Sequence, residues 1–242
     1  MMATSTLPLF YKSPRPLAVE RDSALSFRAP ETFAFAAATN SVPLLAAEFA
    51  SACKHFPIVF TEGPSPQPVA LLGLRTGENL FVDQNGAWQE GVYIPAYIRR
   101  YPFIFMENTA TSEFTLCIDE ASGCLVDGQD NPFFADGKPT EMATKALDFL
   151  REFQGQHAFT VEFMTAVYAA GLLTEKRADI TLKDGQIFSL SGFMVIDEDL
   201  LNKVPADEFQ RWRERGWLGV IYAHLLSVRS WSTLLDWVSR RG

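Results

Sequence analysis

The spacing of the apolar residues changes along this chain, and that change restricts the fold more than any other feature of the sequence. As far as about Thr115, apolar residues gather in short runs separated by turn residues, which is typical of buried strands. Beyond Pro139 they recur every three or four residues, which is typical of amphipathic helices. The sequence therefore predicts an α+β protein, with a mostly antiparallel or mixed sheet, helices packed on one side, and a mainly helical C-terminal half.

Several runs in the first part of the chain predict individual strands and turns. Asn85-Gly86 lies between apolar residues 80–82 and Trp88 and predicts a hairpin turn, because both turn residues tolerate positive φ. The proline-rich residues 63–68 are predicted to connect two strands and not two domains. Buried strands are predicted at residues 57–60, 69–74, 103–106 and 114–118.

Capping residues and periodicity predict the helices. Asn40 and Ser41 can cap a helix over residues 40–54 that tolerates Pro43 in its first turn. A helix that starts at Pro139 is predicted to end at Gly155, and a second one follows it over residues 159–172. An Asp-Gly turn at residues 183–186 predicts a second hairpin. Further helices are predicted at residues 95–101, 197–203, 206–215 and 218–238.

The composition fits one globular domain over residues 1–242. The chain is 48% hydrophobic and contains 20 phenylalanines, which is enough to fill a sizeable core, and we find no internal repeat or heptad run. A net charge of -8 argues against general binding to nucleic acid, so we expect no nucleic-acid partner. Residues 42–47 and 216–228 are apolar, but a membrane span needs about 20 such residues, so we expect none.

The N-terminus and the cysteines point to the same compartment. No apolar segment of signal-peptide length follows Met1, so a cytoplasmic location is expected. Cys53, Cys117 and Cys124 form an odd set without a CxxC pair, which favours buried, reduced thiols. A disulfide between Cys117 and Cys124 is an alternative, because both lie near a predicted strand turn.

The sequence contains no motif of a nucleotide site, a hydrolase or a zinc site, and we identify no catalytic residue. A histidine metal site would require His55, His157 and His224 to meet in space, and His224 in an apolar helix is predicted to belong to the core. The oxygen-rich residues 127–131 break the spacing of a calcium loop and predict a solvated turn. We therefore expect no metal and no cofactor.

The most suggestive segment for binding is residues 93–103, in which two arginines lie among three tyrosines and a phenylalanine. Arginine beside aromatic rings can hold a carboxylate or phosphate while a ring stacks on a planar ligand. Alternatively, the tyrosines pack in the core and the arginines pair with acidic neighbours. The candidate ligand-binding residues are Tyr93, Tyr97, Arg99, Arg100, Asp83 and Glu48.

A series of segments, in this order, resembles the SapC family, which is named after a bacterial surface-array gene cluster. The resemblance runs from about Tyr11 to about Leu235. It implies a gene neighbourhood with outer-membrane TonB-dependent receptors, flavin-dependent tryptophan halogenases and cupin-like proteins, and it supplies no catalytic residue. The segments that carry it are NSVPLLAAEF (40–49), PIVF (57–60), VALLGL (69–74), ENLFVD (78–83), YIPAYIRRYPF (93–103), LSGF (190–193) and YAHLLS (222–227).

Three functions remain open at this point. The first is a cytoplasmic adaptor that binds a peptide or protein partner through the aromatic and arginine segment or through a free sheet edge. The second is an enzyme or small-ligand protein that uses Glu48 and Asp83 together with Arg99. The third is a surface-layer or secretion-associated component, as the family name implies. The oligomeric state is open in all three cases.

Overall fold

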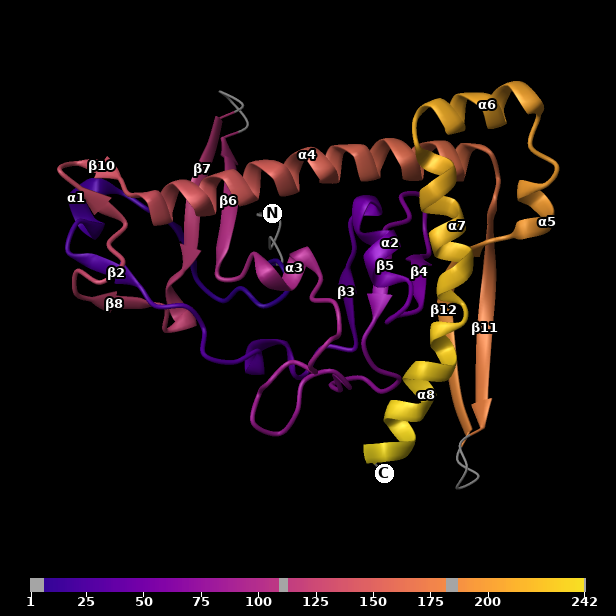
Figure 1. Ribbon diagram of the computed structural model, residues 1–242, viewed down its shortest axis with the longest axis horizontal. Coiled ribbons are helices and arrows are strands. Elements are labelled where there is room, and N and C mark those ends of the chain that lie inside the picture. The colour runs from indigo at the N-terminus through magenta and orange to yellow at the C-terminus, as the bar shows by residue number, and fades with distance from the viewer. Residues whose placement is uncertain (1–6, 109–112, 182–186, 242) are drawn as a thin grey trace, which may run out of the picture. The chain divides into compact units, whose positions relative to one another are not determined.

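The structure is a computed structural model, and it describes residues 7–108, 113–181 and 187–241 (Figure 1). Its internal contacts divide the chain into two compact units. Unit 1 consists of Met1–Phe35 and Ile98–Gln154, and unit 2 of Ala36–Tyr97 and Gly155–Gly242. Each unit thus takes two separate stretches of the chain, and a single domain over residues 1–242 stays a prediction.

Unit 1 is built on a three-stranded antiparallel sheet with strand order β1-β7-β6. Two smaller antiparallel pairs, β2 with β8 and β9 with β10, complete its strands. In chain order its elements are β1 (Pro14–Pro16), α1 (Val19–Asp22), β2 (Leu25–Phe27), β6 (Phe103–Asn108), β7 (Glu113–Asp119), η3 (Glu120–Ser122), β8 (Leu125–Asp127), β9 (Phe134–Ala135), β10 (Lys138–Pro139) and the first half of α4 (Glu141–Ala169).

The core of unit 1 forms where one face of this sheet meets the first half of α4. Phe103 on β6 lies opposite Ile118 on β7, so both side chains point to the same face of the sheet. They join a buried cluster with Leu116, with Phe133 from the loop before β9, and with Leu150 from α4. The apolar runs that predicted these strands therefore supply one wall of the core.

Unit 2 is built on a five-stranded sheet with order β11-β12-β4-β5-β3, in which all neighbouring strands are antiparallel. Its elements are β3 (Ser41–Pro43), η2 (Ala46–Glu48), α2 (Phe49–Ala52), β4 (Ile58–Thr61), β5 (Pro68–Leu71), the second half of α4, β11 (Leu173–Thr181), β12 (Ile187–Ile196), α5 (Glu198–Leu201), α6 (Ala206–Glu214), α7 (Trp217–Ser227) and α8 (Ser230–Arg241). The short elements η1 (Ala34–Ala36) and α3 (Ala96–Arg99) contain two of the three points at which the chain passes between units, and the third lies within α4.

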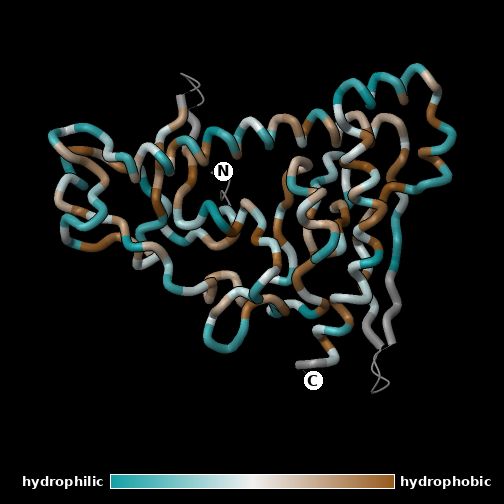
Figure 2. The backbone as a smooth tube through the Cα atoms, viewed as in Figure 1, coloured by the Kyte–Doolittle hydropathy of each residue, from teal (hydrophilic) through white to brown (hydrophobic). Residues whose placement is uncertain are grey.

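Helix α7 packs against β4 and β12, and two polar side chains bond it to backbone groups there. The N–H of Ile196 donates to Nε2 of His224 at 3.0 Å, and the N–H of Ile58 donates to Oγ of Ser227 at 3.1 Å. Both side chains are buried and stand three residues apart, on one face of the helix. Figure 2 shows the difference in character between the hydrophobic α7 and the largely hydrophilic α6.

The structure corrects two helix predictions. Residues 41–43 form strand β3, in which Ser41 pairs with Leu71, and the helical turns begin only at Ala46. The strand pairing with β5 therefore outweighs the helix-capping preference of Asn40 and Ser41. Gly155 does not end a helix, because α4 continues for 29 residues through it. A helical glycine costs only about 1 kcal/mol relative to alanine, which packing along a long helix outweighs.

The turn predictions can be compared with the structure at most positions. Residues 63–68 connect β4 and β5, and Gly86 has a φ of 78° in a turn that is closed by a single bridge between Val82 and Trp88. The Asp-Gly turn at residues 183–186 lies outside the described residues, whereas the strands on both sides of it pair as expected. The predicted helix 218–238 is divided into α7 and α8. None of the described helices combines the length and apolar character that a membrane crossing requires.

Candidate functional site

The six sequence-predicted site residues belong to both units. Glu48, Asp83, Tyr93 and Tyr97 lie in unit 2, whereas Arg99 and Arg100 lie in unit 1. Tyr97 is buried in the core, as the packing interpretation of the tyrosines expected. The two groups are described separately below.

Glu48 already has protein donors for its carboxylate. Its Oε1 accepts hydrogen bonds from the Tyr93 hydroxyl at 2.8 Å and from the Ala96 N–H at 2.7 Å, and its Oε2 accepts from the Leu45 N–H at 2.9 Å. The residue is only 6% exposed. Three protein donors satisfy this buried carboxylate, so Glu48 joins η2 to the segment at the start of α3.

Asp83 is exposed, and its side chain shapes the turn that follows it. Its Oδ1 accepts from the N–H groups of Asn85 and Ala87, at 2.8 and 2.9 Å. With Glu78 and Asn79 it lines a shallow concavity of about 670 Å³ in unit 2. Asn79 in turn is buried, and its amide bonds the carbonyl of Ala36. Asp83 therefore serves an Asx-type turn.

Arg99 and Arg100 both line a cleft in unit 1, and both lie on aromatic rings. The Arg99 Cζ is 5.4 Å from the centre of the Phe149 ring. The Arg100 Cζ is 4.8 Å from the centre of the Phe153 ring and 5.6 Å from that of Tyr11. Such cation–π contacts fix the direction of a guanidinium group while its edge can still donate hydrogen bonds.

The cleft has a volume of about 680 Å³ and is open on one side to solvent. That volume lies within the usual range of ligand pockets. Its surface is mainly apolar, with charged groups around it. The lining comes from four separate segments of the chain: Phe27, Ala29 and Pro30; Arg99, Arg100, Tyr101 and Phe103; Asp130, Asn131 and Pro132; and Thr140, Glu141, Met142, Lys145, Ala146 and Phe149.

Hydrogen bonds hold these segments together. The N–H of Phe27 donates to the carbonyl of Asn131 at 2.8 Å, which ties the end of β2 to the loop before β9. The Thr140 hydroxyl donates to the carbonyl of Pro132 at 2.6 Å and accepts from the N–H of Ala143, so it joins that loop to the start of α4. The ring centres of Phe27 and Phe103 lie 4.9 Å apart beneath this frame. The walls are thus set before any ligand arrives.

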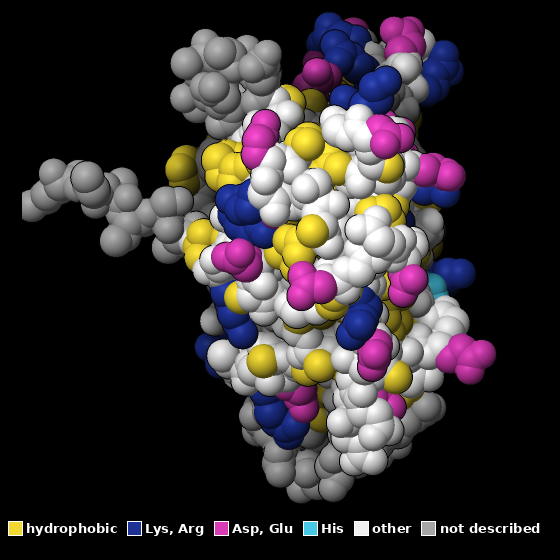
Figure 3. Space-filling model, turned by 90° about the vertical axis from the view of Figure 1, so that its left-hand side faces the viewer, with side chains coloured by type: hydrophobic (Ala, Val, Ile, Leu, Met, Phe, Trp, Pro, Cys, Tyr) yellow, Lys and Arg dark blue, Asp and Glu magenta, His cyan; other side chains and the backbone are white. Residues whose placement is uncertain are grey.

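Charged side chains of both signs surround the cleft. Lys145 Nζ lies 2.7 Å from Glu141 Oε1, one helical turn away on α4, and both side chains are strongly exposed. The hydrogen bond from Lys145, and then its charge, lower the pKa of the Glu141 carboxyl. On the face of the molecule that Figure 3 draws, acidic and basic side chains are interspersed with hydrophobic ones. The charged residues that line the cleft are Arg99, Arg100, Lys145, Asp130 and Glu141, so both signs are present in it.

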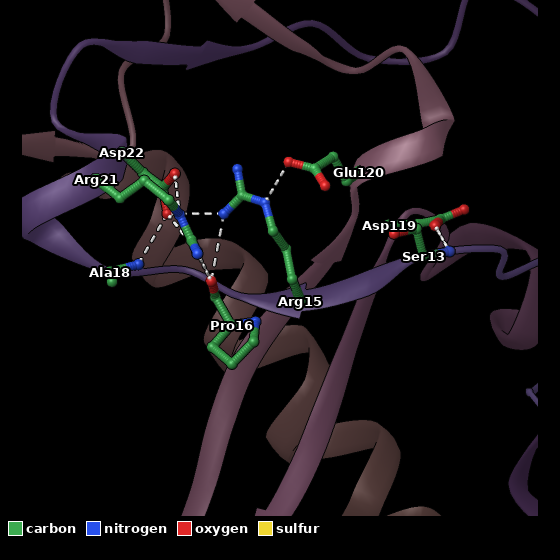
Figure 4. Close-up of polar contacts among 8 residues, drawn as sticks. All are labelled: Ser13, Arg15, Pro16, Ala18, Arg21, Asp22, Asp119 and Glu120. Carbon is green, nitrogen blue, oxygen red and sulfur yellow. Dashed lines mark hydrogen bonds and ion pairs between the residues drawn. The ribbon is translucent and has the colours of Figure 1, made fainter. Parts of the chain in front are cut away.

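Two fully buried aspartates fix the N-terminal segment of unit 1, and sequence reasoning missed both of them (Figure 4). Asp22 accepts from Arg15 at 3.0 Å, from Arg21 at 3.2 Å and from the Ala18 N–H at 2.9 Å. Asp119 accepts from the N–H groups of residues 12 and 13, the shorter bond being 2.6 Å, and from the Tyr101 hydroxyl at 3.2 Å. The partners of Asp119 lie as far as 107 residues away in the sequence, so no local spacing signals it, whereas Asp22 takes its donors from residues 15–21.

The ionisation of these groups follows from their surroundings. Burial alone would raise the pKa of Asp22, but the hydrogen bonds from Arg15 and Arg21 outweigh it, and the pKa lies below its usual value. Burial raises the pKa of the Tyr101 phenol, and the neighbouring Asp119 raises it further. Asp22 therefore remains charged and Tyr101 protonated at neutral pH, which suits a structural network.

The cysteines and histidines are dispersed. Cys117 and Cys124 are buried thiols whose pKa values burial raises, and Cys53 is half-buried. His224 is fully buried on α7, as expected for a core histidine. Among the described residues, no three His, Cys, Asp or Glu side chains are grouped so that they could hold a metal ion.

Comparison with known proteins gives one match. No curated protein and no solved structure matches the chain. The family model described as SapC matches residues 17–234 of the 242 residues. This stretch includes nearly all of both units, with the arginines of the cleft and the buried aspartates among its residues. The chain therefore belongs to the SapC family.

Proposed function

We propose that this protein is a cytoplasmic accessory or adaptor protein that binds a peptide segment of a protein partner in the unit 1 cleft. The observation that carries the proposal is how the cleft is built. It has a volume of about 680 Å³ and a mainly apolar surface, and arginines that lie over aromatic rings are part of its lining. Peptide-recognition sites commonly combine an apolar pocket for an anchoring side chain with polar groups at its rim. The partner would belong to the system that the family's gene neighbourhood implies.

The preformed walls support this proposal further. Thr140, Pro132 and Phe27 connect three of the four segments that line the cleft, so a ligand does not have to order these three. Binding to a preorganised surface avoids part of the entropic cost of association. The opening to solvent also allows a chain to enter and leave across the cleft, as a peptide requires.

The enzyme alternative receives less support from the same observations. It relied on Glu48 and Asp83 together with Arg99. Glu48 is buried and accepts three hydrogen bonds from the protein itself, and Asp83 holds a turn. A small-molecule ligand remains the second candidate, because the cleft volume suits one.

Phage selection of peptides, combined with a variant whose cleft is filled by a tryptophan side chain, tests the proposal. Ala29 is exposed and lines the cleft from the loop after β2, so Ala29→Trp should fill the cleft without disturbing the core. Ala24 directly precedes β2, is also exposed and does not line the cleft, so Ala24→Trp is the matched control. Peptides from a random phage library would be selected on the unchanged protein. We expect the enriched peptides to bind the Ala24→Trp variant and to lose binding to Ala29→Trp.

An NMR spectrum of the methionine methyl groups shows where an enriched peptide binds. Met142 lines the cleft, whereas Met164 and Met194 belong to unit 2, and the chain has only six methionines to assign. An enriched peptide should shift the Met142 methyl signal and leave Met164 and Met194 in place. Enriched peptides that bind both tryptophan variants equally, or an absence of enrichment, would contradict a peptide site in this cleft.

A further inference from the structure

The charges around the cleft point to the chemistry of its ligand. We infer that the cleft selects a peptide in which a large apolar side chain is followed by a carboxylate, and that Glu141 competes with this carboxylate for Lys145. This inference rests on the proposed function and adds two elements to it: the ligand class and a built-in competitor.

The balance of charge at the cleft favours an anion. Its lining contains three basic residues, Arg99, Arg100 and Lys145, and two acidic ones, Asp130 and Glu141. The whole chain, by contrast, has a net charge of -8. A locally basic cleft in an acidic protein attracts a carboxylate and disfavours a basic peptide, since like charges brought together repel. The apolar floor supplies the second requirement, an apolar side chain beside that carboxylate.

The guanidinium of Arg99 is suited to a carboxylate. Its cation lies over the Phe149 ring, and the residue itself is exposed to solvent at the cleft. Stacking restricts the arginine to one orientation, so less rotamer entropy is lost when its N–H groups meet a carboxylate. The same Phe149 ring is part of the lining, so an apolar side chain and a carboxylate can bind next to each other.

Glu141 gives the cleft an internal competitor. Its carboxylate occupies Lys145 at 2.7 Å, and the exposed fractions of the two side chains, 82% and 75%, show that both can turn towards a ligand. An exposed pair of this kind contributes little free energy, so a ligand carboxylate can replace Glu141 at Lys145. The replaced Glu141 then stays near the ligand as an uncompensated like charge. The affinity for an acidic peptide is therefore lower than the basic residues alone would give.

Two synthetic peptides test this, Ac-Gly-Phe-Glu-Gly-NH₂ and its glutamine counterpart Ac-Gly-Phe-Gln-Gly-NH₂. Each is titrated against the full chain while the Met142 methyl shift is followed. The glutamate peptide should bind about two- to fivefold more tightly, as expected for one exposed charge contact. Glu141→Gln should tighten it by about the same factor, and Lys145→Gln should weaken it. Each substitution should change the affinity of the glutamate peptide more than that of the glutamine peptide, so the ratio of the two affinities is the quantity to compare.

A second charged pair on the same helix supplies the control. Asp148 and Arg151 form an ion pair at 3.1 Å with comparable exposure, and neither lines the cleft. Asp148→Asn and Arg151→Gln should leave both affinities unchanged. If the two peptides shift Met142 with equal affinity in all variants, the inference is wrong while a peptide site stands. If neither peptide shifts Met142, the inference is wrong, and the phage selection described above decides separately whether the cleft binds peptides.

Discussion

The buried histidine on α7 makes the stability of unit 2 depend on pH. His224 is fully buried, and its Nε2 accepts the N–H of Ile196, so the ring is held in its neutral form with the proton on Nδ1. Burial lowers the pKa of His224 from 6.5 to about 4. In the unfolded chain the same imidazole takes up a proton near its ordinary pKa. Lowering the pH from 7 to 5 should therefore destabilise the folded state.

The magnitude follows from the two pKa values. The folded pKa is depressed, so the unfolded state binds more protons between pH 6.5 and about 4. The contribution of His224 is complete above pH 6.5 and decreases as the pH falls through this window. Each pKa unit corresponds to about 1.4 kcal/mol, which gives a loss of about 2 kcal/mol between pH 7 and pH 5 and about 3 kcal/mol in total.

Urea unfolding followed by tryptophan fluorescence is the appropriate assay. All five tryptophans, Trp88, Trp212, Trp217, Trp231 and Trp237, belong to unit 2, so their emission reports on the unit that contains His224. With an m-value of about 2 kcal/mol/M, a loss of about 2 kcal/mol lowers the midpoint by about 1 M urea between pH 7 and pH 5.

The variant His224→Gln separates this effect from other titrations. A glutamine oxygen can accept the Ile196 N–H but does not titrate, so the variant should lose much less stability than the unchanged protein between pH 7 and pH 5. His55, whose pKa is lowered by burial and then by Lys54, contributes in both proteins and cancels in the comparison. Equal losses in the two proteins would refute the reasoning.

Three substitutions test other parts of the structure. Asp22→Asn removes the buried carboxylate that Arg15 bonds and should destabilise unit 1 by about 3 kcal/mol. Unit 1 has no tryptophan, so its unfolding is followed by far-UV circular dichroism. An unchanged melting curve would contradict the hydrogen-bond network around Asp22. Gly155→Ala should stabilise the chain by about 1 kcal/mol in urea unfolding, since an added Cβ meets no described atom within 4 Å, and a loss would show that α4 bends there. Ser227→Ala leaves the buried N–H of Ile58 without its acceptor and should cost about 1–3 kcal/mol by tryptophan fluorescence, so a neutral result would argue against that bond.

The predictions that succeeded rest on patterns within a few residues. The strand at β4 and the turn at Gly86 each carry their signal in adjacent residues, and both occur as expected. The failures occur where a partner distant in sequence outweighs a local preference. Ser41 and Pro43 look like a helix start, but pairing with β5 makes them a strand. Gly155 looks like a helix end, but α4 continues through it.

The site could be predicted only in part for the same reason. The arginines at positions 99 and 100 drew attention because aromatic residues surround them in the sequence, and both line the cleft. The other walls come from segments around residues 27–30, 130–132 and 140–149, which meet only in the folded unit. Asp119 left no signal, because its donors lie 18 to 107 residues away in the sequence. Asp22 has its arginine donors within seven residues, but no local pattern marks its carboxylate as buried.

The division of each unit into two stretches has a consequence for synthesis on the ribosome. The chain passes between the units three times, and unit 1 has all its residues once Gln154 has been made. Unit 2 begins at residue 36 but receives β12 and α7 only after unit 1 is complete. Ile58 on β4 therefore emerges 169 residues before Ser227, its eventual partner. Until β12 (Ile187–Ile196) has been made, β4 has an open edge in the nascent chain, at which a chaperone or a neighbouring nascent chain can pair.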